Sequence, residues 1–179
     1  NADMTKTEIQ PTMWGIFFED INLGADGGLY AELVKNRSFE FYNPKAGWTL
    51  MSRATDSSLF NILSRGSLDE KNPRFARLAV GKSVEPYCLS NAGFRGIGMK
   101  KDLSYSFSLM ASVHDAGHVT LRVELVDSKG RSAGVTSLIL EGRKWKKYTA
   151  GLTATATDPK ASLKLWFEGK STVDIDMVS

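Results

Sequence analysis

The stretch YSFSLMASVHDAGHVTLRVELVD, residues 105–127, decides the fold because it consists of two alternating runs joined by a short polar turn. In residues 105–113 every second side chain is apolar, and the positions between them are serines and one methionine. In residues 119–125 apolar side chains alternate with polar ones such as Arg122 and Glu124. A period of two is typical of a strand with one buried face. The stretch therefore predicts two strands that form a β-hairpin.

The same alternation recurs along most of the chain after about Asn36. The runs are ARLAV (Ala76–Val80), VTSLIL (Val135–Leu140), WKKYTA (Trp145–Ala150), LKLWF (Leu163–Phe167) and VDIDMV (Val173–Val178). Segments rich in Gly, Asp, Ser and Lys separate them, as expected of turns. About eight short strands in such an arrangement are typical of a two-sheet sandwich. We therefore predict a mainly β protein in which residues 36–179 form an antiparallel β-sandwich, a jelly roll.

The first 35 residues have a different pattern. MWGIFF, residues 13–18, is apolar on both faces apart from one glycine, which is typical of a strand in a parallel sheet. Residues 25–36 follow, with Leu29 and Leu33 four positions apart, and predict a short helix. A parallel strand needs parallel neighbours, and no second β-α unit follows. We expect residues 1–35 to be a lone β-α segment of a larger fold, with a domain boundary before residue 36.

Composition excludes several classes of protein. The 179 residues are 42% hydrophobic and 24% charged, which argues against a disordered or collagen-like chain. The single cysteine, Cys88, cannot form an internal disulfide. A net charge of +3 is too small to indicate a nucleic-acid partner. No apolar run has membrane-spanning length, so we expect no membrane span.

Two groups of residues invite a functional interpretation. His114 and His118 flank the turn of the predicted hairpin, where histidines are usually solvent-facing. RKWKKY, residues 143–148, interleaves basic and aromatic residues, as some nucleic-acid-binding proteins do. Since no second basic cluster accompanies it, we interpret it as a strand with Trp145 packed and its lysines in solvent, and we expect no nucleic-acid partner.

Two longer stretches carry a family resemblance. MWGIFFEDINLGADGGLYAELVKNRSFEF, residues 13–41, closely resembles the N-terminal signature of glycoside hydrolase family 51 α-L-arabinofuranosidases. The segments NRSFEF (residues 36–41), LSNAGFRGIGM (residues 89–99), WKKY (residues 145–148) and VDIDMVS (residues 173–179) resemble carbohydrate-binding modules of the family 4, 9 and 22 type. The resemblance implies that residues 1–35 open a truncated (β/α)8 barrel and that residues 36–179 form a carbohydrate-binding-module-like sandwich.

The resemblance also implies a function. Family 51 enzymes remove arabinofuranosyl side chains from plant cell-wall polysaccharides, and the resemblance implies an extracellular or periplasmic location and no required cofactor. They are retaining enzymes with two catalytic glutamates. No carboxylate of this chain matches either one, so we assign no catalytic residue and expect no hydrolysis by this chain alone. Glu19 matches a first-strand glutamate that hydrogen-bonds the arabinofuranose, the alternative being a solvated residue at a strand end.

For the sandwich, the resemblance implies a structural calcium site. Glu40 and Asp176 match its carboxylates, and the carbonyl of Ser38 is a third donor. Calcium binds six to eight oxygens, so main-chain groups and water complete such a site. The alternative is that the two acids are simply exposed.

Carbohydrate binding needs outward-facing aromatic rings, because the C–H faces of sugars pack on them. Trp166 lies on the polar side of the run LKLWF and is the best candidate, followed by Tyr87 and Arg95. Trp48 and Trp145 match positions that are usually buried in such modules. An outward tryptophan can equally pack on the missing barrel, as can the serine face of residues 104–112. The apolar strand at residues 13–18 also favours self-association if it is left unpaired.

Overall fold

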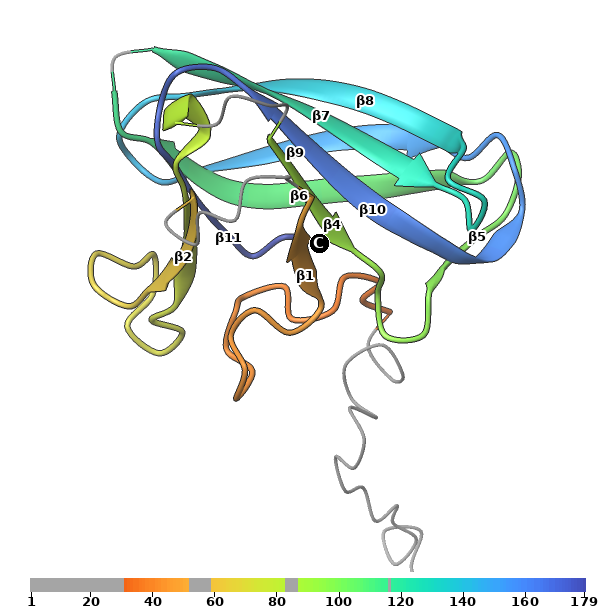
Figure 1. Cartoon of the computed structure of the whole chain (residues 1–179), viewed down its shortest axis with the longest axis horizontal. Coiled ribbons are helices and arrows are strands. Elements are labelled where there is room, and N and C mark those ends of the chain that lie inside the picture. Colours follow the sequence, from red (N-terminus) through yellow and green to blue (C-terminus); the bar gives the residue numbers. More distant parts are fainter. Residues whose placement is uncertain (1–30, 52–58, 83–86, 116) are drawn as a thin grey trace, which may run out of the picture.

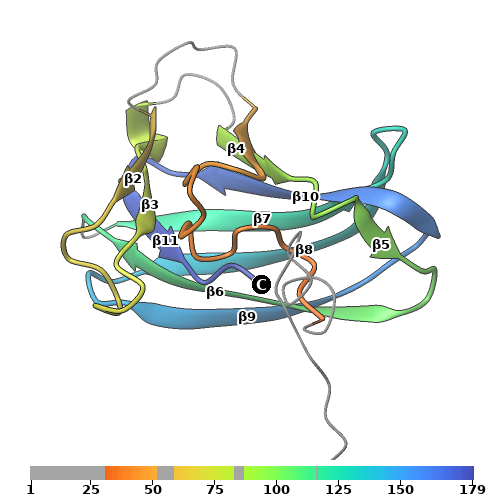
Figure 2. The same ribbon diagram turned by 90° about the horizontal axis from the view of Figure 1, so that it is seen from below.

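The computed structural model describes residues 31–51, 59–82, 87–115 and 117–179. Within these ranges the chain forms eleven β-strands and one short 3-10 helix. The strands make two sheets in which every pairing is antiparallel. Figures 1 and 2 show β7 and β10 in one layer and β6 and β9 in the other. The predicted antiparallel β-sandwich is confirmed.

The first sheet has the order β1-β4-β10-β7-β8, and β5 pairs with β10 outside this order. Its strands are β1 (Trp48–Leu50), β4 (Tyr87–Asn91), β5 (Ile97–Met99), β7 (His118–Val126), β8 (Ser132–Glu141) and β10 (Asp158–Glu168). Strand β10 is central, so that Leu165 lies opposite Leu89 of β4 and Val123 of β7. The outer face of β10 is therefore flanked by side chains of two other strands.

The second sheet has the order β2-β3-β11-β6-β9. Its strands are β2 (Phe60–Leu63), β3 (Phe75–Leu78), β6 (Ser104–Val113), β9 (Lys146–Thr153) and β11 (Val173–Asp176), and the 3-10 helix η3 (Val80–Lys82) follows β3. The late strand β11 lies between β3 and β6, where Ile175 is opposite both Ala76 and Ala111. Segments about a hundred residues apart in sequence thus meet in the middle of this sheet.

The apolar faces predicted from the alternation fill the space between the sheets. Leu109 and Ala111 of β6 and Leu121 and Val123 of β7 are at most 1% exposed. The predicted hairpin, however, is wrong, because β6 belongs to the second sheet and β7 to the first. The two strands bury their apolar faces in the same core from opposite sides, which satisfies the alternation without pairing them.

The predicted helix at residues 25–36 is wrong for residues 31–36, which are not helical. Instead of bonding along a helix, the amide and carbonyl of Lys35 bond the side chain of Asn91 at 3.2 and 2.9 Å. The indole of Trp48 donates to the carbonyl of Asn36 at 3.0 Å. Val34 packs in the sandwich core. The expected strand at residues 13–18, Glu19 and residues 25–30 lie outside the described residues, and the predictions for them remain predictions.

Candidate functional site

Trp166 lies on the outer face of the first sheet, as predicted. Its neighbours Leu165 and Phe167 point into the core and are at most 1% exposed, whereas Trp166 is half-buried. In the sheet, Trp166 lies opposite Arg122 of β7 on one side and Cys88 of β4 on the other. The ring is therefore presented from the middle of a rigid surface and not from a loop.

Charged side chains surround the Trp166 ring. The indole Nε1–H donates to the Glu124 carboxylate at 2.7 Å, and the same oxygen accepts from Arg122 at 3.2 Å. The Arg122 guanidinium lies 4.8 Å from the ring centroid and the Lys164 ammonium 5.9 Å. We refer to Trp166, Arg122, Glu124 and Lys164 as the Trp166 cluster. It combines an aromatic ring with donors and an acceptor in a fixed arrangement.

The chemistry of the Trp166 cluster suits a polyhydroxylated ligand. A carboxylate accepts and a guanidinium donates in pairs, which matches neighbouring sugar hydroxyls. The indole edge supplies apolar surface for sugar C–H groups. Because Glu124 is 8% exposed and already holds the indole and Arg122, the cluster is ordered before any ligand arrives.

Apolar side chains adjoin the Trp166 cluster on the same face. Val135 and Ile139 of the edge strand β8 are 49% and 61% exposed. They flank Ser137, which lies opposite Arg122 in the β7–β8 pairing. Such a strip is also suited to packing against another protein surface.

Two of the predicted sugar-binding residues do not join Trp166. Tyr87 is 1% exposed, its hydroxyl donates to the carbonyl of Leu59, and burial raises its pKa well above the ordinary value. The prediction that Tyr87 contacts sugar is therefore wrong. Arg95 is exposed, but its carbonyl accepts from Lys160 at 2.8 Å. Lys160 lies near the start of β10, six residues from Trp166, which corresponds to about 20 Å along an extended strand.

The predicted calcium ligand Asp176 is buried rather than exposed. It ends β11, is 1% exposed, and accepts from the amide of Met177 at 2.7 Å through Oδ1. Among the residues that the structure describes, its Oδ2 has no hydrogen-bond partner. Burial is the main cause that raises the pKa of Asp176 to about 7; the Met177 amide lowers it, and the negative charge of Glu40 raises it. A buried, unsatisfied carboxylate oxygen fits a site for a cation.

Glu40 lies near Asp176 but is engaged elsewhere. Its Oε1 accepts from the amide of Arg74 at 2.7 Å, and its Oε2 lies 3.8 Å from the Arg74 guanidinium. A pocket of about 440 Å³ beside Asp176 is also lined by Asp69 and Glu70. In the described part of the chain, no three His, Cys, Asp or Glu side chains converge as a metal site. A calcium ion held by Glu40 and Asp176 therefore needs main-chain oxygens, such as that of half-buried Ser38, and water.

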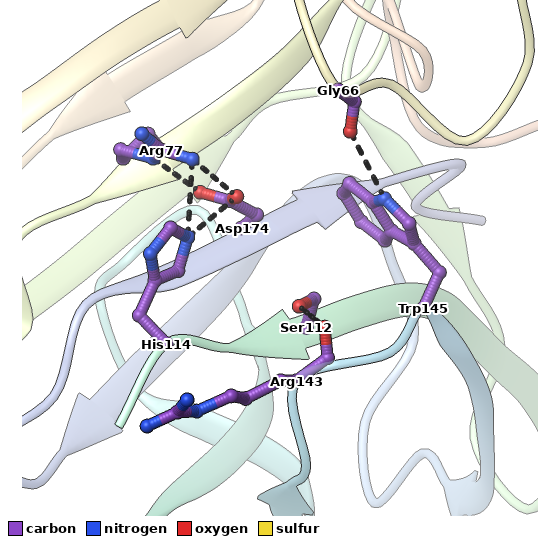
Figure 3. A network of polar contacts seen from close by, with 7 residues as sticks. All are labelled: Gly66, Arg77, Ser112, His114, Arg143, Trp145 and Asp174. Atoms are coloured by element: carbon purple, nitrogen blue, oxygen red, sulfur yellow. Dashed lines mark hydrogen bonds and ion pairs between the residues drawn. The ribbon is translucent and has the colours of Figure 1, made fainter.

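Figure 3 shows a polar cluster on the outer face of the second sheet that the sequence did not predict. Arg77 of β3 donates to both carboxylate oxygens of Asp174 of β11 at 2.7 Å. The Nε2 atom of His114 lies 2.8 Å from one of these oxygens. Asp174 is only 5% exposed, so its charge is neutralised by neighbours and not by water. No sequence signal links these residues, because their contact depends on the β3–β11 register.

Trp145 lies beside this cluster and differs from expectation. Trp48 is buried, at 5% exposed, as the module resemblance implies. Trp145 is half-buried outside the core, so the full burial that the resemblance implies is not found, although the ring is packed as predicted. Its indole donates to the carbonyl of Gly66 at 3.3 Å, and its ring meets Phe75 edge-on at 5.5 Å between centroids.

Comparison with known proteins places these features in a family context. The chain is 38% identical, over 96% of its length, to an extracellular exo-α-L-arabinofuranosidase of Streptomyces chartreusis. It is 33% identical, over 96% of its length, to α-L-arabinofuranosidase 1 of Arabidopsis thaliana. The resemblance to α-L-arabinofuranosidases is confirmed. The chain spans 20% of the Streptomyces relative and 27% of the Arabidopsis relative.

Solved structures agree with this relationship. An arabinose-bound family 51 α-L-arabinofuranosidase matches 90% of this chain and 28% of its own, at a TM-score of 0.78 and 27% identity. The family 22 module and catalytic module of xylanase 10B of Clostridium thermocellum, complexed with xylohexaose, match 81% of this chain and 27% of their own, at a TM-score of 0.54. With 13% identity, this second likeness concerns the fold alone. No protein-family model matches the chain. Within the described ranges, no helix has the length and apolar character needed to cross a membrane.

Proposed function

We propose that this chain belongs to a retaining α-L-arabinofuranosidase that removes arabinofuranosyl side chains from plant cell-wall polysaccharides, outside the cell or in the periplasm. Its similarity to enzymes of that name over 96% of its length supports the activity class. Glu19 hydrogen-bonds the arabinofuranose, and two glutamates from other parts of the protein act as acid/base and nucleophile. This chain alone then has no hydrolytic activity.

The sandwich binds carbohydrate through the Trp166 cluster. The observation that carries this proposal is the Trp166 ring on a sheet face, with its indole bonded to Glu124 at 2.7 Å and Arg122 over the ring. A sugar ring packs on the indole while its hydroxyls bond the carboxylate and the guanidinium.

Isothermal titration with arabinan and arabinoxylan oligosaccharides tests the proposal. We expect saturable binding by the wild-type chain that Trp166→Ala abolishes. Tyr42→Ala is a matched control, because Tyr42 is fully exposed and offers an aromatic ring with no cluster around it. Absence of binding by the wild type, or equal loss in both variants, overturns the proposal.

A structural role for the same face is the second candidate. The exposed Val135 and Ile139 favour it, because such a strip is suited to packing on a catalytic barrel. The double variant Val135→Ser, Ile139→Ser separates the two roles. If the variant binds sugar as tightly as the wild type, carbohydrate binding is favoured. If the wild type does not bind sugar and the variant self-associates less than the wild type, packing is favoured.

We also propose that calcium stabilises the sandwich between Glu40 and Asp176, with the carbonyl of Ser38 as a further donor. The support is the buried Oδ2 of Asp176, which has no hydrogen-bond partner in the described part of the chain. Calcium supplies positive charge to this oxygen, so the carboxylate remains ionised without a protein partner.

A further inference from the structure

A separate pocket of about 630 Å³ lies where β7 begins, β8 ends and β9 begins. It is lined by the first four residues of the RKWKKY motif, together with His118 and Glu141. None of its lining residues belongs to the Trp166 cluster. The motif therefore contributes to a pocket through its first residues and to strand β9 from Lys146 onward.

The backbone of the β8–β9 turn is held in place by the strands around it. The amide of Val113 donates to the carbonyl of Gly142 at 2.8 Å, and the hydroxyl of Ser112 donates to the carbonyl of Arg143 at 2.9 Å. The Tyr148 hydroxyl donates to the carbonyl of Glu141 at 2.8 Å and accepts from its amide at 3.0 Å. The turn's backbone therefore bonds the surrounding strands, and the side chains of Arg143 and Lys144 are exposed.

Trp145 forms one wall of the pocket in a fixed orientation. The bond to Gly66 and the edge contact with Phe75 hold one side of the indole. The residue also lines the pocket. A ring that is anchored on one edge and half-exposed offers apolar surface to a ligand at little cost in side-chain entropy.

The cations of the pocket are only partly neutralised. Lys146 lies 4.0 Å from the carboxylate of Glu141, and Asp115 is a second acid of the lining. Arg143 and Lys144 are exposed, and neither forms an ion pair with any residue of the described part of the chain. Figure 3 shows the Arg143 side chain extending away from the Arg77–Asp174 pair. Two cations therefore remain for a ligand.

We propose that this pocket binds a carboxylate-bearing sugar, a uronic acid unit of an acidic oligosaccharide. The sugar ring packs on Trp145, and its carboxylate bonds the guanidinium of Arg143 and the ammonium of Lys144. The acids Glu141 and Asp115 accept from the hydroxyls. They disfavour a nucleic-acid backbone, whose phosphates offer no hydroxyl donors for Glu141 and Asp115 and repel their carboxylates.

Titration with a matched pair of ligands tests this site on the whole chain. The probes are a trimer of α-1,4-linked galacturonic acid and the same trimer after reduction of its carboxyls to uncharged galactose. We expect the acidic trimer to bind about tenfold more tightly, as one charge-assisted contact predicts. The double variant Arg143→Gln, Lys144→Gln removes this preference. The matched control Lys100→Gln, Lys101→Gln changes two exposed lysines of another turn and retains it.

Equal affinity for the two trimers, or no binding of the acidic one, overturns the proposal. Tighter binding of a single-stranded oligonucleotide than of the acidic trimer, lost in the same double variant, also overturns it and makes the pocket a nucleic-acid contact. Trp166→Ala leaves the acidic trimer's affinity unchanged, so failure of the Trp166 cluster as a sugar site is distinguishable from failure of this one.

Discussion

Arg77 and Asp174 are joined by two hydrogen bonds of 2.7 Å each, directly across the pairing of β3 with β11. The hydrogen bond to the carboxylate is the main cause that raises the pKa of Arg77 above its ordinary value. The aspartate is 5% exposed, and His114 is its further polar neighbour. The two neighbouring strands β3 and β11 are therefore joined by an ion pair as well as by backbone hydrogen bonds.

Arg77→Met removes the partner of a carboxylate that water barely reaches. We expect the free energy of unfolding to fall by about 2 kcal/mol, because Asp174 keeps only His114. Lys146→Met is the control, since its ion pair with Glu141 spans 4.0 Å and both side chains are more than half exposed. Urea unfolding should show a change within about 0.5 kcal/mol for the control. If Arg77→Met and Lys146→Met lower the free energy of unfolding by similar amounts, the Arg77–Asp174 pair has no special role in stability.

The stability of the sandwich should depend on pH through Asp176. Its pKa is about 7 in the folded chain and near 3.8 in the unfolded one, so the folded state binds one more proton between these values. With respect to this group, stability is therefore highest below about pH 4. It falls by about 4 kcal/mol as the pH rises to 7. Urea unfolding in chelator at several pH values measures this. Asp176→Asn should remove the dependence, whereas Asp102→Asn, at an exposed site, should keep it.

Calcium should reverse this loss if it binds at Asp176. At pH 8 a concentration of a hundred times the dissociation constant should stabilise the fold by about 2.7 kcal/mol. At pH 5 the effect should be smaller, because the proton on Asp176 competes with the ion. Thermal unfolding with calcium and with chelator measures both. A calcium effect of equal size in Asp176→Asn places the ion elsewhere.

Two glycines of ordinary backbone conformation should respond in opposite directions to alanine. A Cβ at Gly81, in η3, meets the carbonyl oxygen of Lys170 at 2.1 Å, so the backbone must move. A Cβ at Gly151, in β9, meets nothing within 4 Å. We expect Gly81→Ala to destabilise by about 1–3 kcal/mol and Gly151→Ala to stabilise by a few tenths to about 1 kcal/mol. A Gly81→Ala variant as stable as the wild type contradicts the close approach of Lys170 to η3, and a destabilised Gly151→Ala variant contradicts the open space at Gly151.

Tyr87→Phe should affect stability and not sugar binding. The variant removes one of two donors to the carbonyl of Leu59, which keeps the amide of Ala79 at 3.0 Å, so we expect a loss of about 1 kcal/mol. Because Tyr87 is 1% exposed, the affinity for arabinose-containing oligosaccharides should equal that of the wild type. Urea denaturation measures the loss of stability, and isothermal titration measures the sugar affinity. A variant that loses sugar affinity but not stability contradicts the expectation.

Alternation also carried a signal about Tyr87. Tyr87 and Leu89 have the same parity on β4, and both are buried. Considering Tyr87 by its residue type alone overlooked this, whereas parity correctly predicted the outward side of Trp166 on β10. On β10 the alternation was a better guide than aromatic character, whereas on β4 it does not separate the faces, because Cys88 is buried as well.

The sequence by itself determined the longer strands and the face of each that enters the core, because side-chain direction alternates with every residue. The short strands β1, β2, β4 and β5 were not among the predicted runs. It also carried the family resemblance, in continuous motifs. Only the tertiary structure decided that β6 and β7 lie in different sheets, that Arg77 meets Asp174, and that the turn before β9 forms a pocket. The physical reason is that alternation specifies a face but not the neighbouring strand. Neighbours and register are set by long-range pairing across the whole sandwich, which no local pattern contains.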